Sequence, residues 1–201
     1  CRCHRDRLRG SRWRTESRLA RLPEDLELEM FETTREIAHE YGFEAYEISN
    51  FARPGAECLH NQNYWHNGPY LGIGPSAVSR VGPTRAGNPR SLGAWRRSIA
   101  AGGREFAWTE TLSPRHRLAE TWWLGLRTRE GVDPAQARAA SGWQGESDPA
   151  VALAEEFLAL DLLAREPRTA DDPRGGERWH LTPRGLPLAD AVATRFLEGL
   201  A

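Results

Sequence analysis

The sequence predicts an α/β fold in two parts, a piece of an α/β barrel followed by a mainly α, winged-helix-like domain. A helical apolar pattern over residues 23–41 is followed, after a one-residue break, by a strand-like run over 43–49. A helix and strand in this order form the αβ half of an α/β barrel unit. Residues 111–201 then hold three helix patterns, two short strand-like runs and a closing helix, which is typical of a winged helix.

Composition limits the class of protein. The 201 residues are enough for one large or two small domains, and the formal net charge of −1 gives no electrostatic reason to expect a nucleic-acid or anionic-membrane partner. Three Cys do not make a disulfide framework. No apolar run approaches the roughly 20 residues that a membrane span needs, and no signal peptide is visible. We therefore expect a cytoplasmic protein without a membrane span.

Residues 1–20 differ from the rest of the chain. They contain seven Arg against two acidic residues and show no helical or strand period. Such a block is usually a solvated or disordered arm, and a nucleic-acid or membrane arm is the less common alternative. Because this block is atypical and the chain starts with Cys, we expect a truncated or frame-shifted gene product whose ordinary sequence begins near Arg21.

The barrel-like part begins with the clearest helix pattern. Acidic side chains favour the positive end of the helix dipole near Pro23, and Gly42 is a plausible stop after the last turn. In the strand that follows, alternation places Ala45, Glu47 and Ser49 on one face, and Tyr46 and Ile48 on the other. Glu47 is then either a buried, paired structural carboxylate, the interpretation we favour, or a site residue at the strand end.

Three motifs lie close together in this part: Tyr46-Glu-Ile-Ser-Asn-Phe-Ala, His60-Asn-Gln-Asn-Tyr-Trp and Tyr70-Leu-Gly-Ile-Gly. In this order they resemble the radical-SAM family of oxygen-independent coproporphyrinogen III oxidases and HemW-type heme chaperones, and the HemW branch more than the oxidases. The resemblance runs from about Leu22 to the C-terminus. It implies a C-terminal remnant of a radical-SAM partial (β/α) barrel over 21–110, followed by the family's winged-helix-like C-terminal domain over 111–201.

The resemblance also implies binding residues. The matching glycine loop of the family lies beside S-adenosylmethionine, which makes Gly72, Ile73 and Gly74 candidate cofactor contacts; a tight turn at the barrel edge is the alternative. The second motif supplies heme candidates. Imidazole is a normal axial ligand of heme iron, and aromatic rings suit a porphyrin face. These candidates are His60, Asn61, Tyr64 and Trp65, and the alternative is that they serve packing and turn hydrogen bonds on a loop or short strand.

The remaining elements follow from local signals. We expect a loop over 81–90, a helix over 92–101 ending at Gly102-Gly103, and a helix capped by Ser113 with Pro114 at its first position. Later elements are a helix capped by Asp133 and ending at Gly142, a helix over 150–160, strands over 162–165 and 178–181 around a 171–176 turn, and a last helix starting at Thr182-Pro183. The family's Glu-Gly-Val-Asp and Leu-Thr-x-x-Gly signatures occur at 130–133 and 181–185.

One family feature is missing. Radical-SAM chemistry uses a [4Fe–4S] cluster held by three closely spaced Cys, whereas this chain has only Cys1, Cys3 and Cys58. We therefore expect no cluster and no radical chemistry from this chain alone, with heme or porphyrin and a heme-receiving protein as partners. The alternatives are a coproporphyrinogen oxidase fragment and a winged-helix DNA-binding protein, and the 11 Arg against 14 acidic residues of 111–201 argue against the latter.

Overall fold

The computed structural model describes residues 22–103, 105–168 and 176–200. The chain forms two compact units, Cys1–Glu36 and Ile37–Ala201. The boundary between them falls inside helix α3 (Glu24–Glu40), which is the helix predicted from the apolar pattern. No residue of α3 is buried, although Leu26, Met30 and Ile37 form an apolar stripe along it.

The end of α3 confirms the predicted stop. Gly42 has a φ of +77°, and its N–H donates to the carbonyl of His39 over 2.9 Å. The N–H of Phe43 reaches back to the carbonyl of Ala38 over 2.9 Å. This pair of bonds is the Schellman arrangement, in which a left-handed glycine satisfies the last carbonyls of a helix.

The predicted strand over 43–49 is wrong. Only β1 (Glu44–Ala45) is a strand, and it pairs antiparallel with β2 (Phe51–Ala52) to form a small hairpin. The carboxylate of Glu47 accepts hydrogen bonds from the N–H of Ser49 and from the side chain of Asn50, which turns the chain back before a longer strand can form. The predicted alternation also fails, since Tyr46 and Glu47 are both buried.

The next elements correct two more predictions. His60–Trp65 lies on helix α4 (Leu59–Trp65), not on a loop or strand. Residues 81–90 are not a plain loop, because β3 (Val78–Val81) and β4 (Thr84–Gly87) form an antiparallel hairpin there. Its tight turn uses Gly82, whose φ of +59° suits the first position of a two-residue hairpin loop.

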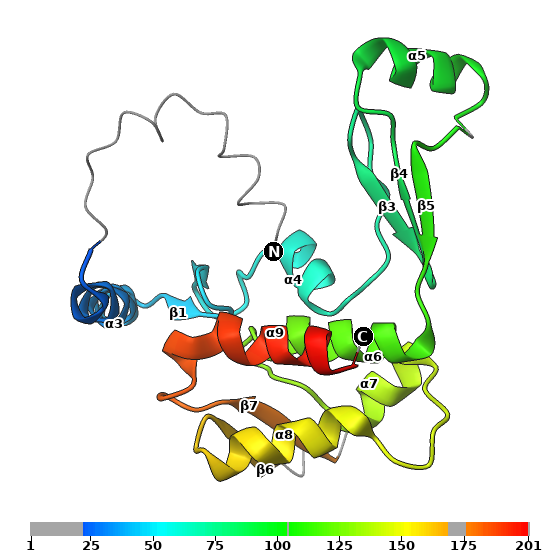
Figure 1. Ribbon diagram of the computed structural model, residues 1–201. Coiled ribbons are helices and arrows are strands. Elements are labelled where there is room, and N and C mark those ends of the chain that lie inside the picture. The colour runs from blue at the N-terminus through cyan, green and yellow to red at the C-terminus, as the bar shows by residue number, and fades with distance from the viewer. Residues whose placement is uncertain (1–21, 104, 169–175, 201) are drawn as a thin grey trace. The chain divides into compact units, whose positions relative to one another are not determined.

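The sheet is completed by β5 (Trp108–Thr111), which pairs with β4 to give the order β3-β4-β5. Helix α5 (Leu92–Ala100) connects β4 to β5, with Ser91 as its N-cap, close to the predicted 92–101. Figure 1 shows the three strands extending away from α6, with α5 at their far end.

The C-terminal part matches its predicted elements well. Helices α6 (Pro114–Gly125), α7 (Pro134–Ser141) and α8 (Pro149–Ala159) are capped by Ser113, Asp133 and Asp148, each followed by Pro. Strands β6 (Leu163–Pro167) and β7 (Glu177–Leu181) form a two-stranded antiparallel sheet. The predicted turn at 171–176 lies almost wholly outside the described residues.

The last helix begins later than predicted. The hydroxyl of Thr182 donates to the carbonyl of Asp161 over 2.7 Å and accepts from the N–H of Gly185 over 3.0 Å, which holds a turn at the expected start. A short 3-10 helix, η1 (Leu186–Leu188), follows, and α9 (Ala189–Leu200) begins after it.

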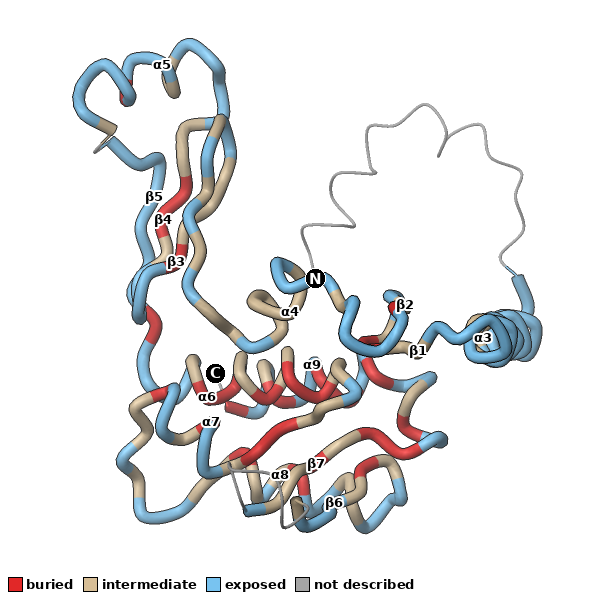
Figure 2. Tube along the Cα trace, turned by 180° about the vertical axis from the view of Figure 1, so that it is seen from behind, coloured by how far each residue is buried: buried red, intermediate tan, exposed pale blue. Residues whose placement is uncertain are grey.

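The apolar core lies in this C-terminal part. Figure 2 shows buried residues concentrated along α6, β7 and α9. Trp122 and Phe196 stack with ring centroids 5.2 Å apart, and Trp179 meets Trp122 edge-on at 6.0 Å. The core cluster consists of Leu118, Ala119, Trp122, Leu126, Val132, Ala137, Ala150, Ala154, Leu163, Trp179, Leu181, Ala189, Val192, Phe196 and Leu200. In the described part of the chain, no helix is long and apolar enough to cross a membrane.

Candidate functional site

Helix α4 places the four heme candidates on two different faces. Side chains four residues apart lie on the same face of a helix, so His60 groups with Tyr64, and Asn61 groups with Trp65. The contacts of each pair confirm this division. The motif therefore has an outer side, with His60 and Tyr64, and an adjacent side, with Asn61 and Trp65, that packs on the protein.

The first face carries an aromatic cluster. The ring of His60 meets the ring of Tyr64 edge-on with centroids 4.9 Å apart, and Tyr64 meets Tyr70 at 4.6 Å. His60 is exposed, and the apolar neighbours of the cluster in sequence are exposed as well, Leu59 by 79% and Leu71 by 76%. An accessible imidazole thus lies against one phenol ring, which in turn contacts a second. We call His60, Tyr64 and Tyr70 the aromatic face.

The second face fastens α4 to the rest of the protein. The side-chain amide of Asn61 donates to the hydroxyl of Tyr46 over 3.2 Å. The guanidinium of Arg127 lies 5.3 Å from the ring centroid of Trp65 and 5.7 Å from that of Trp123, so it is held between two indoles. Asp190 pairs with the same guanidinium at 2.7 Å. Cation–π contacts of this kind stabilise best when they are shielded from water.

The residues just after α4 continue this attachment. His66 Nε2 lies 3.0 Å from a carboxylate oxygen of Glu130, the first residue of the Glu-Gly-Val-Asp signature. The side-chain amide of Asn67 donates to the hydroxyl of Thr121 on α6 over 3.1 Å.

A cavity of about 240 Å³ lies beside these contacts, and its wall includes Trp65, His66 and Glu130. Asp133 also lines it, with its carboxylate 3.4 Å from the guanidinium of Arg168 and both side chains nearly fully buried.

Sequence reasoning missed the partners of the second face. Arg127 and Thr121 lie on or just after α6, more than 50 residues beyond α4, and carry no local signal for this contact. In the Glu130 to Asp133 signature, the sequence predicts the helix cap at Asp133 but no partner for Glu130. The structure gives the signature two local roles, because Glu130 contacts His66 and Asp133 caps α7 by accepting the N–H of Gln136 over 3.0 Å.

The glycine loop before β3 has a clear structural basis. A Cβ on Gly72 would lie 2.4 Å from the carbonyl oxygen of Val78, so only glycine fits beside that strand. Gly74 has a φ of +105°, which other residues rarely adopt. The side-chain amide of Asn88 donates to the carbonyls of both glycines, over 3.1 and 2.9 Å. Ile73 between them is 89% exposed.

In the described part of the chain, no set of three His, Cys, Asp or Glu side chains is placed so that it could hold a metal ion. Cys58 is free and exposed, and Cys1 and Cys3 lie outside the described residues. A site-differentiated [4Fe–4S] cluster requires three thiolates near one another. The described residues do not provide such a set.

Comparison with known proteins supplies the family. A heme chaperone HemW from Synechocystis sp. is 38% identical over 128 residues, which cover 62% of this chain and 31% of that protein. A heme chaperone HemW from Mycobacterium tuberculosis is 35% identical over 156 residues, covering 78% of this chain and 35% of the relative. Over the matched part, these similarities support a HemW/HemN-like family for this chain. No protein-family model matches the chain.

The fold agrees with this similarity. The solved structure of the radical-SAM coproporphyrinogen III oxidase HemN from Escherichia coli superposes with a TM-score of 0.62 at 17% identity, over 89% of this chain and 42% of that one. At this identity the likeness concerns the fold, a radical-SAM-type arrangement of mixed helices and sheets. The HemW-like chain spans about a third of the length of the curated relatives it matches.

Proposed function

We propose that this HemW-like chain binds heme or a related porphyrin on the aromatic face of α4, with His60 as the iron ligand. The observation that carries the proposal is the exposed imidazole of His60, held edge-on against Tyr64, which in turn contacts Tyr70. HemW-type relatives named as heme chaperones support the choice of ligand.

The chemistry of this face suits a porphyrin. Neutral imidazole is a normal axial ligand for heme iron. A porphyrin is a large flat apolar ring, and the rings of Tyr64 and Tyr70 with the exposed side chains of Leu59 and Leu71 offer apolar surface around the imidazole. In this proposal Asn61 and Trp65 do not contact the ligand. They hold α4 in place through Tyr46 and Arg127.

The proposal also includes the S-adenosylmethionine contacts and the partner protein that the family resemblance implies. We assign Gly72, Ile73 and Gly74 as the part of the chain that would contact S-adenosylmethionine, because Ile73 projects into solvent from a loop fixed by Asn88. In radical-SAM proteins this cofactor, together with a [4Fe–4S] cluster, supplies radical chemistry. We propose that the chain is the C-terminal part of such a protein and that a heme-receiving protein is its partner.

We make two further proposals, one on the domains of the chain and one on the iron–sulfur cluster. We propose a barrel remnant over 21–110 and a winged-helix-like domain over 111–201, supported by α6, α7, α8, the β6–β7 pair and α9. We also propose that the chain alone holds no cluster. Anaerobic reconstitution with iron and sulfide should then leave the purified protein colourless, and a stoichiometric [4Fe–4S] spectrum would refute this.

Heme titration tests the main proposal. Ferric heme added to the native chain should give a shifted Soret band, and His60→Ala should weaken the affinity at least about tenfold, equivalent to about 1.4 kcal/mol. His39→Ala is the matched control, because His39 is also an exposed histidine on a helix. It should behave like the native chain. Equal affinities and identical spectra for the native chain and His60→Ala would remove His60 from the site.

A further inference from the structure

We propose that Arg80 is a positioning residue for the aromatic face, acting through the turn that joins α4 to Tyr70. Its effect on heme rests on the proposed function above. Its effect on the arrangement of Tyr64 and Tyr70 does not, and can be measured without heme.

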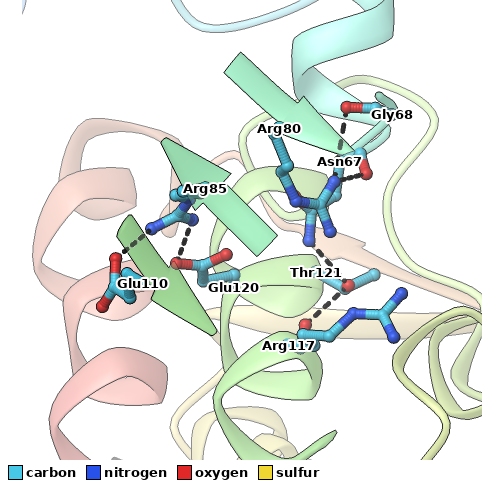
Figure 3. Close-up of polar contacts among 8 residues, drawn as sticks. All are labelled: Asn67, Gly68, Arg80, Arg85, Glu110, Arg117, Glu120 and Thr121. Atoms are coloured by element: carbon cyan, nitrogen blue, oxygen red, sulfur yellow. Dashed lines mark hydrogen bonds and ion pairs between the residues drawn. The ribbon is translucent and has the colours of Figure 1, made fainter. Parts of the chain in front are cut away.

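Arg80 makes two kinds of contact with this turn. Arg80 is only 4% exposed. Its Nη1 donates to the carbonyl of Asn67 and also to the carbonyl of Gly68, the second over 3.3 Å, as Figure 3 shows. Its backbone pairs with Tyr70 in both directions, over 2.9 and 2.8 Å. One residue of β3 thus holds both the start of the turn and the tyrosine at its end.

The turn itself depends on such external support. Asn67 adopts a φ of +54°, which is uncommon for a residue other than glycine. A Cβ on Gly68 would lie 2.2 Å from the side-chain oxygen of Asn63, so the backbone approaches α4 closely here. The side chain of Asn67 is fixed by Thr121, whose own hydroxyl donates to the carbonyl of Arg117 over 2.8 Å. Arg80 and Thr121 therefore hold Asn67 through different groups.

The charge of Arg80 is buried between other ionisable groups. Burial lowers the pKa of its guanidinium, Glu120 acts in the opposite direction, and Arg117 and Arg85 add to the lowering. Burying a guanidinium is costly unless its donors are used. The two turn carbonyls accept the hydrogen bonds of this guanidinium, and its buried Nε has no hydrogen-bond partner among the described residues, so a conformation that lost the turn carbonyls would leave the buried cation poorly satisfied.

Arg85 offers a matched control. It lies directly across from Arg80 in the β3–β4 register, but its guanidinium pairs with Glu120 and, at 3.7 Å, with Glu110. Figure 3 shows both arginines beside α6, only one of them directed at the turn. Replacing Arg85 removes one positive charge from the same strand pair. The carbonyls of Asn67 and Gly68 keep Arg80 as their hydrogen-bond donor.

Fluorotyrosine labelling gives a direct readout, because the chain has four tyrosines: Tyr41, Tyr46, Tyr64 and Tyr70. Each ¹⁹F resonance is assigned with a Tyr→Phe variant. We expect Arg80→Met to shift the Tyr64 and Tyr70 resonances and to leave that of Tyr41 in place, whereas Arg85→Met leaves all of them unchanged. Unchanged Tyr64 and Tyr70 resonances in Arg80→Met would overturn the proposal, and so would equal shifts in Arg85→Met.

Two more variants guard against misfolding of Arg80→Met. Arg80→Lys keeps the charge but cannot span two carbonyls as the planar guanidinium does, so it should shift the same two resonances. Thr121→Val frees the side chain of Asn67 while keeping Arg80, and should shift Tyr70 and Tyr64 less than Arg80→Lys does. Native-like resonances in Arg80→Lys would overturn the proposal even if Arg80→Met could not be purified.

Heme titration of the same variants separates the two proposals. With His60 as ligand, Arg80→Lys should bind heme more weakly than Arg85→Met does, by about tenfold. Shifted tyrosine resonances with unchanged heme affinity would contradict the heme site and leave the role of Arg80 standing. Unshifted resonances with His60-dependent heme binding would contradict the role of Arg80 alone.

Discussion

The two regions of the second compact unit are stabilised in different ways. Residues 112–200 enclose the apolar core, in which Trp122, Trp179 and Phe196 are fully buried. Among the described residues between 43 and 111, only Tyr46, Ala52 and Ala86 are buried apolar side chains. The first region is held by burial of apolar surface, and the second by a few polar and cation–π contacts, several of them with α6.

This difference bears on function. The aromatic face, the glycine loop and the turn held by Arg80 all belong to the region with little core of its own. Binding residues commonly lie on loops and short elements that a rigid scaffold positions. Here α6 is that scaffold, since its Thr121 and Glu120, and Arg127 just beyond it, contact the region before it.

Amide hydrogen exchange should show the largest contrast between the two regions. Exchange in α6 and α9 should require global unfolding, whereas β5, whose residues are all exposed, and α5 should open locally. The difference in opening free energy should be on the order of 5 kcal/mol, since global stability of small domains is about 5–15 kcal/mol. Slower amide exchange in β3, β4 and β5 than in α6 would contradict the claim that the C-terminal region is the more stable of the two.

Removal of a core indole should have the next largest effect. Trp122→Ala leaves a cavity against Phe196 and Trp179 and should lower the free energy of unfolding by about 3–5 kcal/mol. Trp108→Ala on β5 is the control, because Trp108 is 44% exposed, and its cost should stay below about 1.5 kcal/mol. Urea unfolding followed by far-UV circular dichroism measures both, and similar costs would contradict the comparison.

A glycine pair tests the close contacts of the core region. Gly131 and Gly142 have nearly equal φ angles, +72° and +74°, but a Cβ on Gly131 would lie 2.3 Å from the carbonyl oxygen of Trp179, whereas one on Gly142 would meet nothing within 4 Å. Gly142→Ala should cost about 1–2 kcal/mol for the left-handed conformation. Gly131→Ala should cost a further ~1–3 kcal/mol from overpacking. Both variants are measured by urea unfolding. Equal losses of unfolding free energy in the two would show that the backbone at Gly131 shifts to accommodate the added methyl group, and would contradict the expected overpacking.

The smallest expected effect concerns His180 on β7. Burial, followed by the charge of Arg178, lowers the pKa of its imidazole below 6.5, and Glu166 opposes this only in part. Between pH 6.5 and the lowered folded pKa, the unfolded chain therefore takes up a proton that the folded chain does not, and stability falls as pH falls. His180→Gln should weaken this loss of stability between pH 7.5 and 5.5 in urea unfolding, and an equal loss in the native chain and the variant would contradict the assignment.

Local signals predicted much of the fold. The Ser113-Pro114 and Asp133-Pro134 starts and the Gly42 and Gly142 stops are correct, because caps depend on nearby atoms alone. The predicted strand over 43–49 and the predicted loop or strand at His60–Trp65 are wrong. In these segments the conformation depends on a side-chain contact within a turn or on packing against residues far away in the sequence. Glu47 converts a strand-like run into a hairpin, and α4 is a seven-residue helix too short to be stable without packing.

The candidate site was predictable in part. The sequence identified His60 and Tyr64 but grouped them with Asn61 and Trp65, because nothing in the motif revealed a helix with two faces. Tyr70 joins the aromatic face through the turn after α4, which a linear motif does not show. Arg80 gave no signal at all, since a lone arginine in a strand is usually exposed.

The most direct test of the divided motif uses ferric heme bound to the fluorotyrosine-labelled native chain. Because ferric iron broadens nearby resonances, Tyr64 and Tyr70 should broaden first, and Tyr46, whose hydroxyl accepts from Asn61 on the side of α4 that packs on the protein, should broaden less. Tyr41, 73% exposed, reports non-specific binding. Stronger broadening of Tyr46 or Tyr41 than of Tyr64 and Tyr70 would contradict heme binding on the aromatic face.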